Sequence, residues 1–114
     1  RIRFCRPPSE RGSLGEPTTP LVTLPWPTGE TTFKLDPSQP TGSFKDRASA
    51  LLVGWRQARG IDRVAEDSSG NAGASLAAYT ARAGIACDIF VPATASSGAR
   101  APAFATGTAW RRSA

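Results

Sequence analysis

Residues 63–91 have the sequence RVAEDSSGNAGASLAAYTARAGIACDIFV, and this stretch decides the fold. Residues 63–67 and 86–91 are short segments that contain Val, Ile and Phe, which favour strands. Between them, the Ala-rich residues 72–82 predict a helix, and Gly84 is placed to end it. A strand, a helix and a further strand in this order form a βαβ unit, so the two strands are expected to be parallel.

A second helix is predicted upstream, over residues 44–59. Its apolar side chains recur at the spacing of one helix face, namely Phe44, Ala48, Leu51, Leu52 and Trp55. Ser43 is a favourable N-cap, and Asp46 three residues later completes an acidic form of the capping box. Gly60 is suited to the position just after the helix.

Two more strands are predicted before this helix, at residues 21–24 and 31–35, and Pro25 is expected to end the first. Strands and helices therefore alternate, and the expected fold class is α/β, with a parallel sheet covered by helices. Residues 1–20 show no period and predict an extended arm. Residues 98–114 are rich in Ala, Ser, Thr and Arg and predict a disordered tail.

The positive charge of the chain is confined to its two ends. The net charge is +5 over 114 residues; residues 1–12 hold four Arg and one Glu, and residues 100–114 hold three Arg and no acid. Residues 13–99 hold seven basic and eight acidic side chains. A nucleic-acid-binding domain normally carries its basic residues on the folded face, so no nucleic-acid partner is expected. A binder that uses only the two basic ends stays open as an alternative.

The composition also bounds the compartment and the class of site. His is absent and the two cysteines, Cys5 and Cys87, are far apart, which argues against a metal site or a disulfide framework. We therefore expect a reducing, cytoplasmic compartment. No stretch approaches the roughly 20 apolar residues of a membrane span, so no membrane partner is expected. The chain begins with Arg1 and contains no Met, which predicts a piece of a longer protein. A natural truncation, a frameshift and an artefact all stay open.

Two loops of small residues each lead into a predicted helix: residues 40–47 (PTGSFKDR) and residues 68–73 (SSGNAG). A helix N-terminus presents unpaired N–H groups and a partial positive charge, so it suits a carboxylate or a phosphate. Gly70 and Gly73 would let the backbone approach such a ligand closely. The alternative interpretation of residues 68–73 is a simple strand-to-helix turn with a capping residue.

Lys45 is the unusual residue of the first loop, because the chain has 12 Arg but only two Lys. In the first turn of a helix, the helix dipole favours the neutral amine, which is the form that attacks a carbonyl to give a Schiff base. On composition alone, a surface lysine paired with Asp46 is the simpler interpretation.

Four motifs in order resemble those of one enzyme family. PTGSFKDR at residues 40–47 resembles the lysine motif of threonine synthases, within the fold-type II pyridoxal-phosphate enzymes (the tryptophan synthase beta superfamily). SSGNAG at residues 68–73 resembles the asparagine loop of that family. LGEPTTPLV at residues 14–22 resembles its amino-terminal signature, and IFVPATAS at residues 89–96 resembles the strand and turn that follow. The resemblance identifies residues 21–97 as part of a catalytic domain.

The resemblance implies a role for each matching residue. Lys45 would bind pyridoxal 5'-phosphate as a Schiff base and then transfer protons. Asn71 would donate a hydrogen bond to an oxygen on the cofactor ring. Ser69, Gly70, Asn71 and Ala72 would bind the carboxylate of a small-molecule amino-acid substrate.

The reaction implied is the lyase reaction of threonine synthase in threonine biosynthesis, which converts O-phosphohomoserine to threonine and phosphate. Ala48 departs from the family, which usually has Gly after Lys-Asp-Arg. The loop that binds the cofactor phosphate lies far downstream in the family and has no counterpart here, so the 114 residues are expected to be inactive alone. Intact relatives are expected to be homodimers. A threonine or serine dehydratase and a non-catalytic remnant stay open as alternatives.

Overall fold

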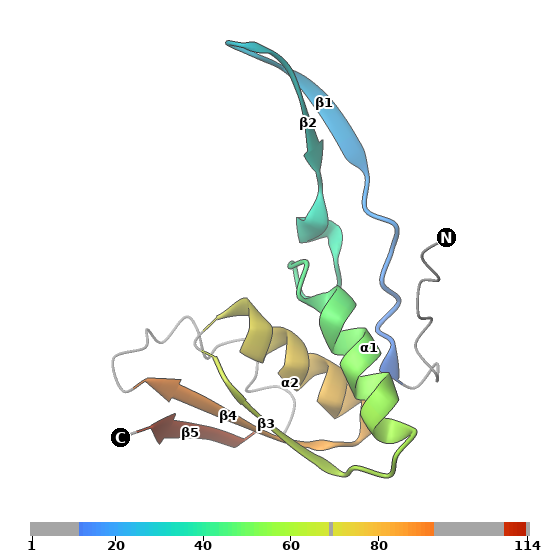
Figure 1. Ribbon diagram of the computed structural model, residues 1–114, viewed down its shortest axis with the longest axis vertical. Coiled ribbons are helices and arrows are strands. Elements are labelled where there is room, and N and C mark those ends of the chain that lie inside the picture. The colour runs from blue at the N-terminus through green and yellow to red at the C-terminus, as the bar shows by residue number, and fades with distance from the viewer. Residues whose placement is uncertain (1–11, 69, 93–108, 114) are drawn as a thin grey trace.

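The computed structural model describes residues 12–68, 70–92 and 109–113 (Figure 1). The elements, in chain order, are β1 (Leu21–Trp26), β2 (Gly29–Lys34), the 3-10 helix η2 (Asp36–Ser38), α1 (Asp46–Gln57), β3 (Arg63–Asp67), α2 (Asn71–Ala83), β4 (Ala86–Pro92) and β5 (Ala109–Ser113). They form a small parallel sheet that packs against helices and a separate antiparallel hairpin. The α/β fold class predicted from the sequence is confirmed.

The parallel sheet has the order β3-β4-β5. β3 and β4 are the parallel pair that the βαβ pattern predicts, with Val64 opposite Cys87. β5 is also parallel to β4, with Phe90 opposite Arg111. This strand differs from the expected absence of regular structure over residues 98–114. It could not be recognised because the segment has no alternating apolar pattern, and the strand is defined by its pairing with β4. The rest of the tail lies outside the described residues.

β1 and β2 pair with each other in an antiparallel hairpin instead of joining the parallel sheet. The hairpin projects away from the two helices (Figure 1). Pro25 lies inside β1, opposite Glu30, so the expectation that it ends the strand is wrong. β1 tolerates proline because β2 is its only neighbour in the described part of the chain, and an edge strand can lack one N–H donor. Near the turn, the Trp26 and Phe33 rings meet edge to face, 5.8 Å between centroids.

Gly84 directly follows α2, as predicted, whereas α1 ends at Gln57 and a turn leads from it to Gly60. Gly60 and Gly84 adopt left-handed conformations, with φ of 65° and 70°, and the Ile85 N–H donates to the Thr80 carbonyl at 2.9 Å. This arrangement satisfies carbonyl groups that a helix end otherwise leaves unpaired. α1 is shorter than the predicted helix over residues 44–59, because residues 44 and 45 form a turn before it and residues 58–60 form a turn after it.

The buried face of α1 is not the apolar face that the sequence predicts. Leu51, Leu52 and Trp55 are each about two-fifths exposed, and Phe44 is 56% exposed. The buried residues of α1 are Asp46, Ser49, Ala50, Val53 and Gly54. They recur with the same period on another side of the helix, and most are small. Small side chains let α1 pack closely on α2, which explains why this face is buried.

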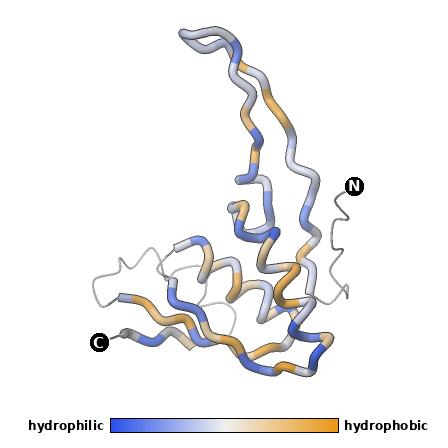
Figure 2. The backbone as a smooth tube through the Cα atoms, in the orientation of Figure 1, coloured by the Kyte–Doolittle hydropathy of each residue, from blue (hydrophilic) through white to orange (hydrophobic). Residues whose placement is uncertain are grey.

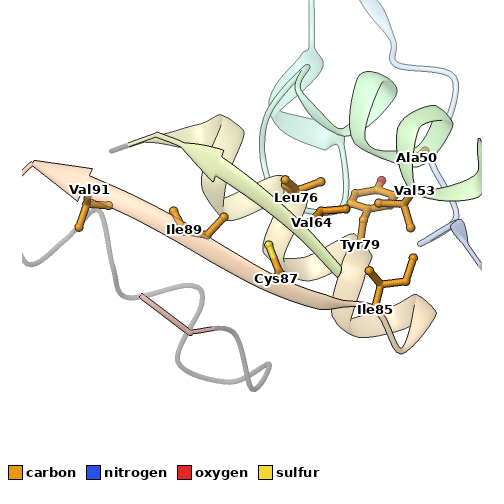
Figure 3. Close-up of a cluster of buried hydrophobic side chains, with 9 residues drawn as sticks. All are labelled: Ala50, Val53, Val64, Leu76, Tyr79, Ile85, Cys87, Ile89 and Val91. Carbon is orange, nitrogen blue, oxygen red and sulfur yellow. The ribbon is translucent and has the colours of Figure 1, made fainter. Parts of the chain in front are cut away.

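The core lies between α1, α2 and the sheet. α2 packs on β4 on one side and on α1 on the other, and β4 is hydrophobic along most of its length (Figure 2). The buried cluster consists of Ala50, Val53, Val64, Leu76, Tyr79, Ile85, Cys87, Ile89 and Val91 (Figure 3). These side chains come from α1, α2, β3 and β4, and Ile85 lies just before β4, so the cluster holds the two helices on one face of the sheet.

Asp88 links the three strands of the sheet. Its carboxylate accepts hydrogen bonds from the Arg63 side chain of β3 at 2.7 Å and from the Arg111 side chain of β5 at 2.8 Å. The Asp88 residue is 6% exposed, whereas both arginine side chains are more than half exposed. The hydrogen bond from Arg63, followed by that from Arg111, lowers the pKa of Asp88 to about 2.

We expect the stability of the fold to fall between about pH 4 and pH 2 because of Asp88. A carboxyl group whose pKa is lower in the folded state stabilises the fold above its unfolded pKa, here near 3.8, and loses that contribution as it is protonated. Urea unfolding of Asp88→Asn, followed by circular dichroism, should show lower stability at pH 7 and less loss on acidification. Glu30→Gln, an exposed carboxylate on β2, is the matched control. Identical pH profiles for wild type and Asp88→Asn would contradict the assignment.

Candidate active site

Lys45 lies at the N-cap of α1 and lines a cavity. The lysine is half-buried, and its Nζ atom lies 4.7 Å from the centroid of the Phe44 ring. The cavity measures about 200 Å³, and its walls are Lys45, Ala48, Ser49, Leu52, Glu66, Ala72 and Leu76. α1, α2 and β3 all contribute to it. Lys45 is therefore placed at the junction of three elements.

Asp46, the next residue, is buried at 0% exposure and fixes the start of α1. Its carboxylate accepts hydrogen bonds from the Thr41 N–H at 2.7 Å, from the Thr41 hydroxyl, and from the Ser75 hydroxyl of α2 at 2.7 Å. The Ser75 hydroxyl also lies 2.8 Å from that of Ser49. Since Ser75 has one hydroxyl hydrogen, it donates to Asp46 and accepts from Ser49. This network connects the loop before Lys45 to α2.

The predicted capping box is absent. The Ser43 hydroxyl accepts a hydrogen bond from the Lys45 N–H at 3.1 Å, as a capping side chain does. The Asp46 carboxylate, however, binds Thr41 and Ser75 instead of the Ser43 N–H. Among the ion pairs of the described residues, Lys45 is not paired with Asp46, whose carboxylate accepts from Thr41 and Ser75.

Arg47 attaches the same turn to the base of the hairpin. Its guanidinium donates to the Asp36 carboxylate at 2.8 Å and to the Thr19 hydroxyl at 2.9 Å. The hydrogen bond from Arg47 is the main reason that the pKa of Asp36 lies below its usual value. Lys45, Asp46 and Arg47 thus point to three different parts of the molecule.

The loop before α2 leads several backbone N–H groups to the start of the helix. The Ser68 hydroxyl accepts hydrogen bonds from the Gly73 N–H at 3.0 Å and the Gly70 N–H at 3.3 Å. The N–H groups of Asn71 and Ala72 have no hydrogen-bond partner among the described residues. They lie at the positive end of a 13-residue helix, which is the arrangement that suits a carboxylate or phosphate.

The structure brings only some of the predicted site residues to the cavity. Ala72 lines it together with Lys45, whereas Asn71 is exposed and is not part of its wall. Gly70 has open space around it. Ser69 lies outside the described residues. The roles implied for these four residues stay predictions.

Gly73 serves packing, which corrects the expectation that it admits a ligand. A Cβ atom at this position would lie 3.1 Å from the Ile89 Cγ2 atom and 3.2 Å from the Ser68 Cβ and carbonyl oxygen. The small residue therefore lets α2 begin close to β4, and it faces the sheet.

Glu66 is a charged residue of the cavity that the sequence analysis missed. It lies on β3, two residues after the buried Val64, and is itself half-buried. Burial raises the pKa of Glu66, and the positive charge of Lys45 opposes this in part. The available signal was the alternation of β3, which puts Val64 and Glu66 on the same face of the strand.

The amine of Lys45 and the N–H groups at the start of α2 would suit two kinds of ligand group. The amine could react with the carbonyl of an organic cofactor, and the N–H groups could bind an anion. The cavity offers an amine at Lys45, and the start of α2 offers free N–H donors. The cavity volume of about 200 Å³ is below the roughly 300–1,000 Å³ of a typical ligand pocket. Within the described chain no group of three or more His, Cys, Asp and Glu could hold a metal ion. No described helix is long and apolar enough to cross a membrane.

Comparisons with known proteins match this chain to one family of enzymes. The sequence profile of the family described as "Pyridoxal-phosphate dependent enzyme" matches residues 12–110. Threonine synthase of Mycobacterium leprae is 43% identical over 84 residues, which cover 70% of this chain and 23% of that enzyme. Threonine synthase of Halalkalibacterium halodurans is 38% identical over 84 residues, covering 70% of this chain and 24% of that enzyme. The chain thus spans about a quarter of the length of these relatives.

Solved structures show the same likeness. A crystal structure of O-ureido-L-serine synthase superposes with a TM-score of 0.76 and 28% identity, covering 84% of this chain and 33% of that one. A hydrogen sulfide-producing enzyme from Fusobacterium nucleatum gives a TM-score of 0.75 and 30% identity, covering 82% and 33%.

Removal of the Ser75 hydroxyl is expected to destabilise the fold. Ser75→Ala leaves the buried Asp46 carboxylate with one donor fewer, which costs about 1–3 kcal/mol of unfolding free energy. Urea unfolding is the measurement. Ser38→Ala in the exposed helix η2 is the control and should change stability by less than about 0.5 kcal/mol. If Ser75→Ala proved as stable as wild type, the network would not brace the site.

Proposed function

The chain belongs to the family of pyridoxal-phosphate-dependent enzymes, and on that premise we propose that it carries the lysine-bearing part of a threonine synthase-like lyase. One observation carries this proposal: Lys45 and Ala72, from the two loops that resemble the family's motifs, line the same cavity. The identity of 43% to a threonine synthase over 84 residues supports this reaction class. Residues 21–97 are proposed as the part of the catalytic domain present here.

Lys45 is proposed as the residue that binds the cofactor and moves protons. Pyridoxal phosphate, when bound, supplies an electron sink that stabilises negative charge next to the substrate amine. Lys45 Nζ, at the N-terminus of α1, would accept a proton from a substrate in the cavity and return it to a different carbon. Leu52 and Leu76 form the apolar part of the cavity wall beside Lys45.

The start of α2 is proposed to orient the substrate. The free N–H groups of Asn71 and Ala72, with the helix dipole behind them, would bind the carboxylate of an amino acid. Gly70 leaves room for this, and Ser69 is proposed as a further donor. The exposed Asn71 side chain is free to donate to an oxygen on the cofactor ring.

The proposed overall reaction converts O-phosphohomoserine to threonine and phosphate. The chain spans only 23% of the Mycobacterium leprae enzyme, so we propose that the rest of such a domain is required and that the 114 residues alone are inactive.

The buried thiol of Cys87 is free, and a reducing, cytoplasmic compartment is proposed on that basis.

We expect pyridoxal phosphate followed by borohydride reduction to label Lys45 in the protein expressed from its complete gene. Peptide mass spectrometry locates the adduct, and Lys34, exposed on β2, serves as an internal control. The 114-residue chain should show little adduct, because it holds only part of the site. An adduct elsewhere, with Lys45 unmodified, would overturn the assignment.

The same preparation distinguishes the reactions. Release of phosphate and threonine from O-phosphohomoserine supports the synthase. Formation of a 2-oxo acid and ammonia from threonine or serine supports a dehydratase instead. If neither occurs in a correctly folded preparation, the protein is a non-catalytic remnant.

A further inference from the structure

The cavity next to Lys45 contains one positive and one negative side chain. Of its seven wall residues, Lys45 and Glu66 are the charged ones. They reach it from different elements, since Lys45 lies at the start of α1 and Glu66 on β3. The other wall residues are apolar except for Ser49. A charge in such surroundings interacts more strongly with a second charge than it does in open water.

The alternation of β3 explains why Glu66 is found there. Val64 is 8% exposed and belongs to the core beneath the helices, and Glu66 follows on the same face of the strand. In the parallel sheet Glu66 is opposite Ile89, which is fully buried. The next residue, Asp67, is exposed and lies on the other face.

The Glu66 carboxylate makes no hydrogen bond or ion pair within the described part of the chain. The charged or titratable groups near it are Lys45 from α1 and the Cys87 thiol from β4, while α2 offers only Ala72 and Leu76. Burial, together with smaller effects that include the charge of Glu66, raises the pKa of Cys87, so the thiol is neutral near pH 7. Lys45 is therefore the one opposite charge that Glu66 meets among these neighbours.

We propose that Glu66 is a positioning residue for Lys45: its carboxylate supplies the counter-charge that holds the Lys45 ammonium at the cavity. The consequence concerns position. Glu66 keeps the Lys45 nitrogen at the wall of the cavity, where a carbonyl group of a bound cofactor would have to meet it, and limits its movement into solvent. This significance for catalysis rests on the proposed function, whereas the coupling of the two charges does not.

Because the chain has only two lysines, the coupling can be read from the 114-residue protein labelled with lysine that carries carbon-13 at Cε. In wild type, the Lys45 resonance is expected to shift as Glu66 titrates above its usual value of 4.5. The Lys34 resonance should not shift over this range. Glu66→Gln should abolish this pH-dependent change of the Lys45 resonance, which we call the Lys45 step. Asp67→Asn, which removes the same charge from the opposite face of β3, should preserve it.

A second measurement uses trinitrobenzenesulfonate, which modifies neutral amines and needs no cofactor. At pH 7 the ratio of the Lys45 to the Lys34 modification rate should rise in Glu66→Gln, since the Lys45 amine loses the counter-charge that holds it at the cavity and the reagent reaches it more readily. Glu66→Asp should return most of the wild-type ratio, and Asp67→Asn should leave it unchanged. Circular dichroism verifies that each variant is folded.

The two experiments give outcomes that are easy to separate. An unchanged ratio in folded Glu66→Gln, or an equal rise in Asp67→Asn, overturns the proposal. If Glu66→Gln does not fold, the wild-type titration decides alone, because an absent Lys45 step below pH 7 overturns the coupling. If the step is present but pyridoxal phosphate never labels Lys45 in the complete protein, the proposed function fails and the charge coupling stands.

Discussion

The buried carboxylate of Asp46 is the constraint on which the arrangement of the site depends. A charge removed from water must be paired or hydrogen-bonded, and Asp46 receives donors from Thr41 in the preceding loop and from Ser75 on α2. Those donors fix the distance between α1 and α2 and the path of the loop between residues 41 and 46. Lys45 lies within this segment, so the hydrogen bonds of Asp46 also fix the backbone position of Lys45.

Features set by a few adjacent residues could be predicted from the sequence. Gly84 ends α2 as expected, and β3 occupies residues 63–67 as predicted. The buried face of α1 could not be predicted, because two faces of this helix repeat with the same period. The apolar face containing Leu51 and Trp55 has the stronger pattern. The partner helix nevertheless selects the face with small residues, where Asp46 and Ser49 find donors and acceptors.

The candidate site also contains residues that the sequence predicts and residues that it does not. Lys45 and the loop before α2 were predicted because their motifs are local, and the structure places Lys45 and Ala72 on one cavity. Glu66 was not predicted, since an acidic residue near the end of a strand is usually exposed. Its half-buried position depends on β3 lying beneath the helices. Gly73 was assigned to a ligand, yet its lack of a side chain serves the contact of α2 with Ile89.

The site is held by buried hydrogen bonds as well as by apolar packing. The interface of α1 with α2 contains Asp46, Ser49 and Ser75, while the larger apolar residues of α1 face outward. Loss of an apolar contact lowers stability by an amount that neighbouring side chains partly recover by moving. A buried carboxylate that loses a donor bears the cost of an unmade hydrogen bond. The geometry around Lys45 is therefore more sensitive to a change at a serine of this interface than to a change at a leucine of the same helix.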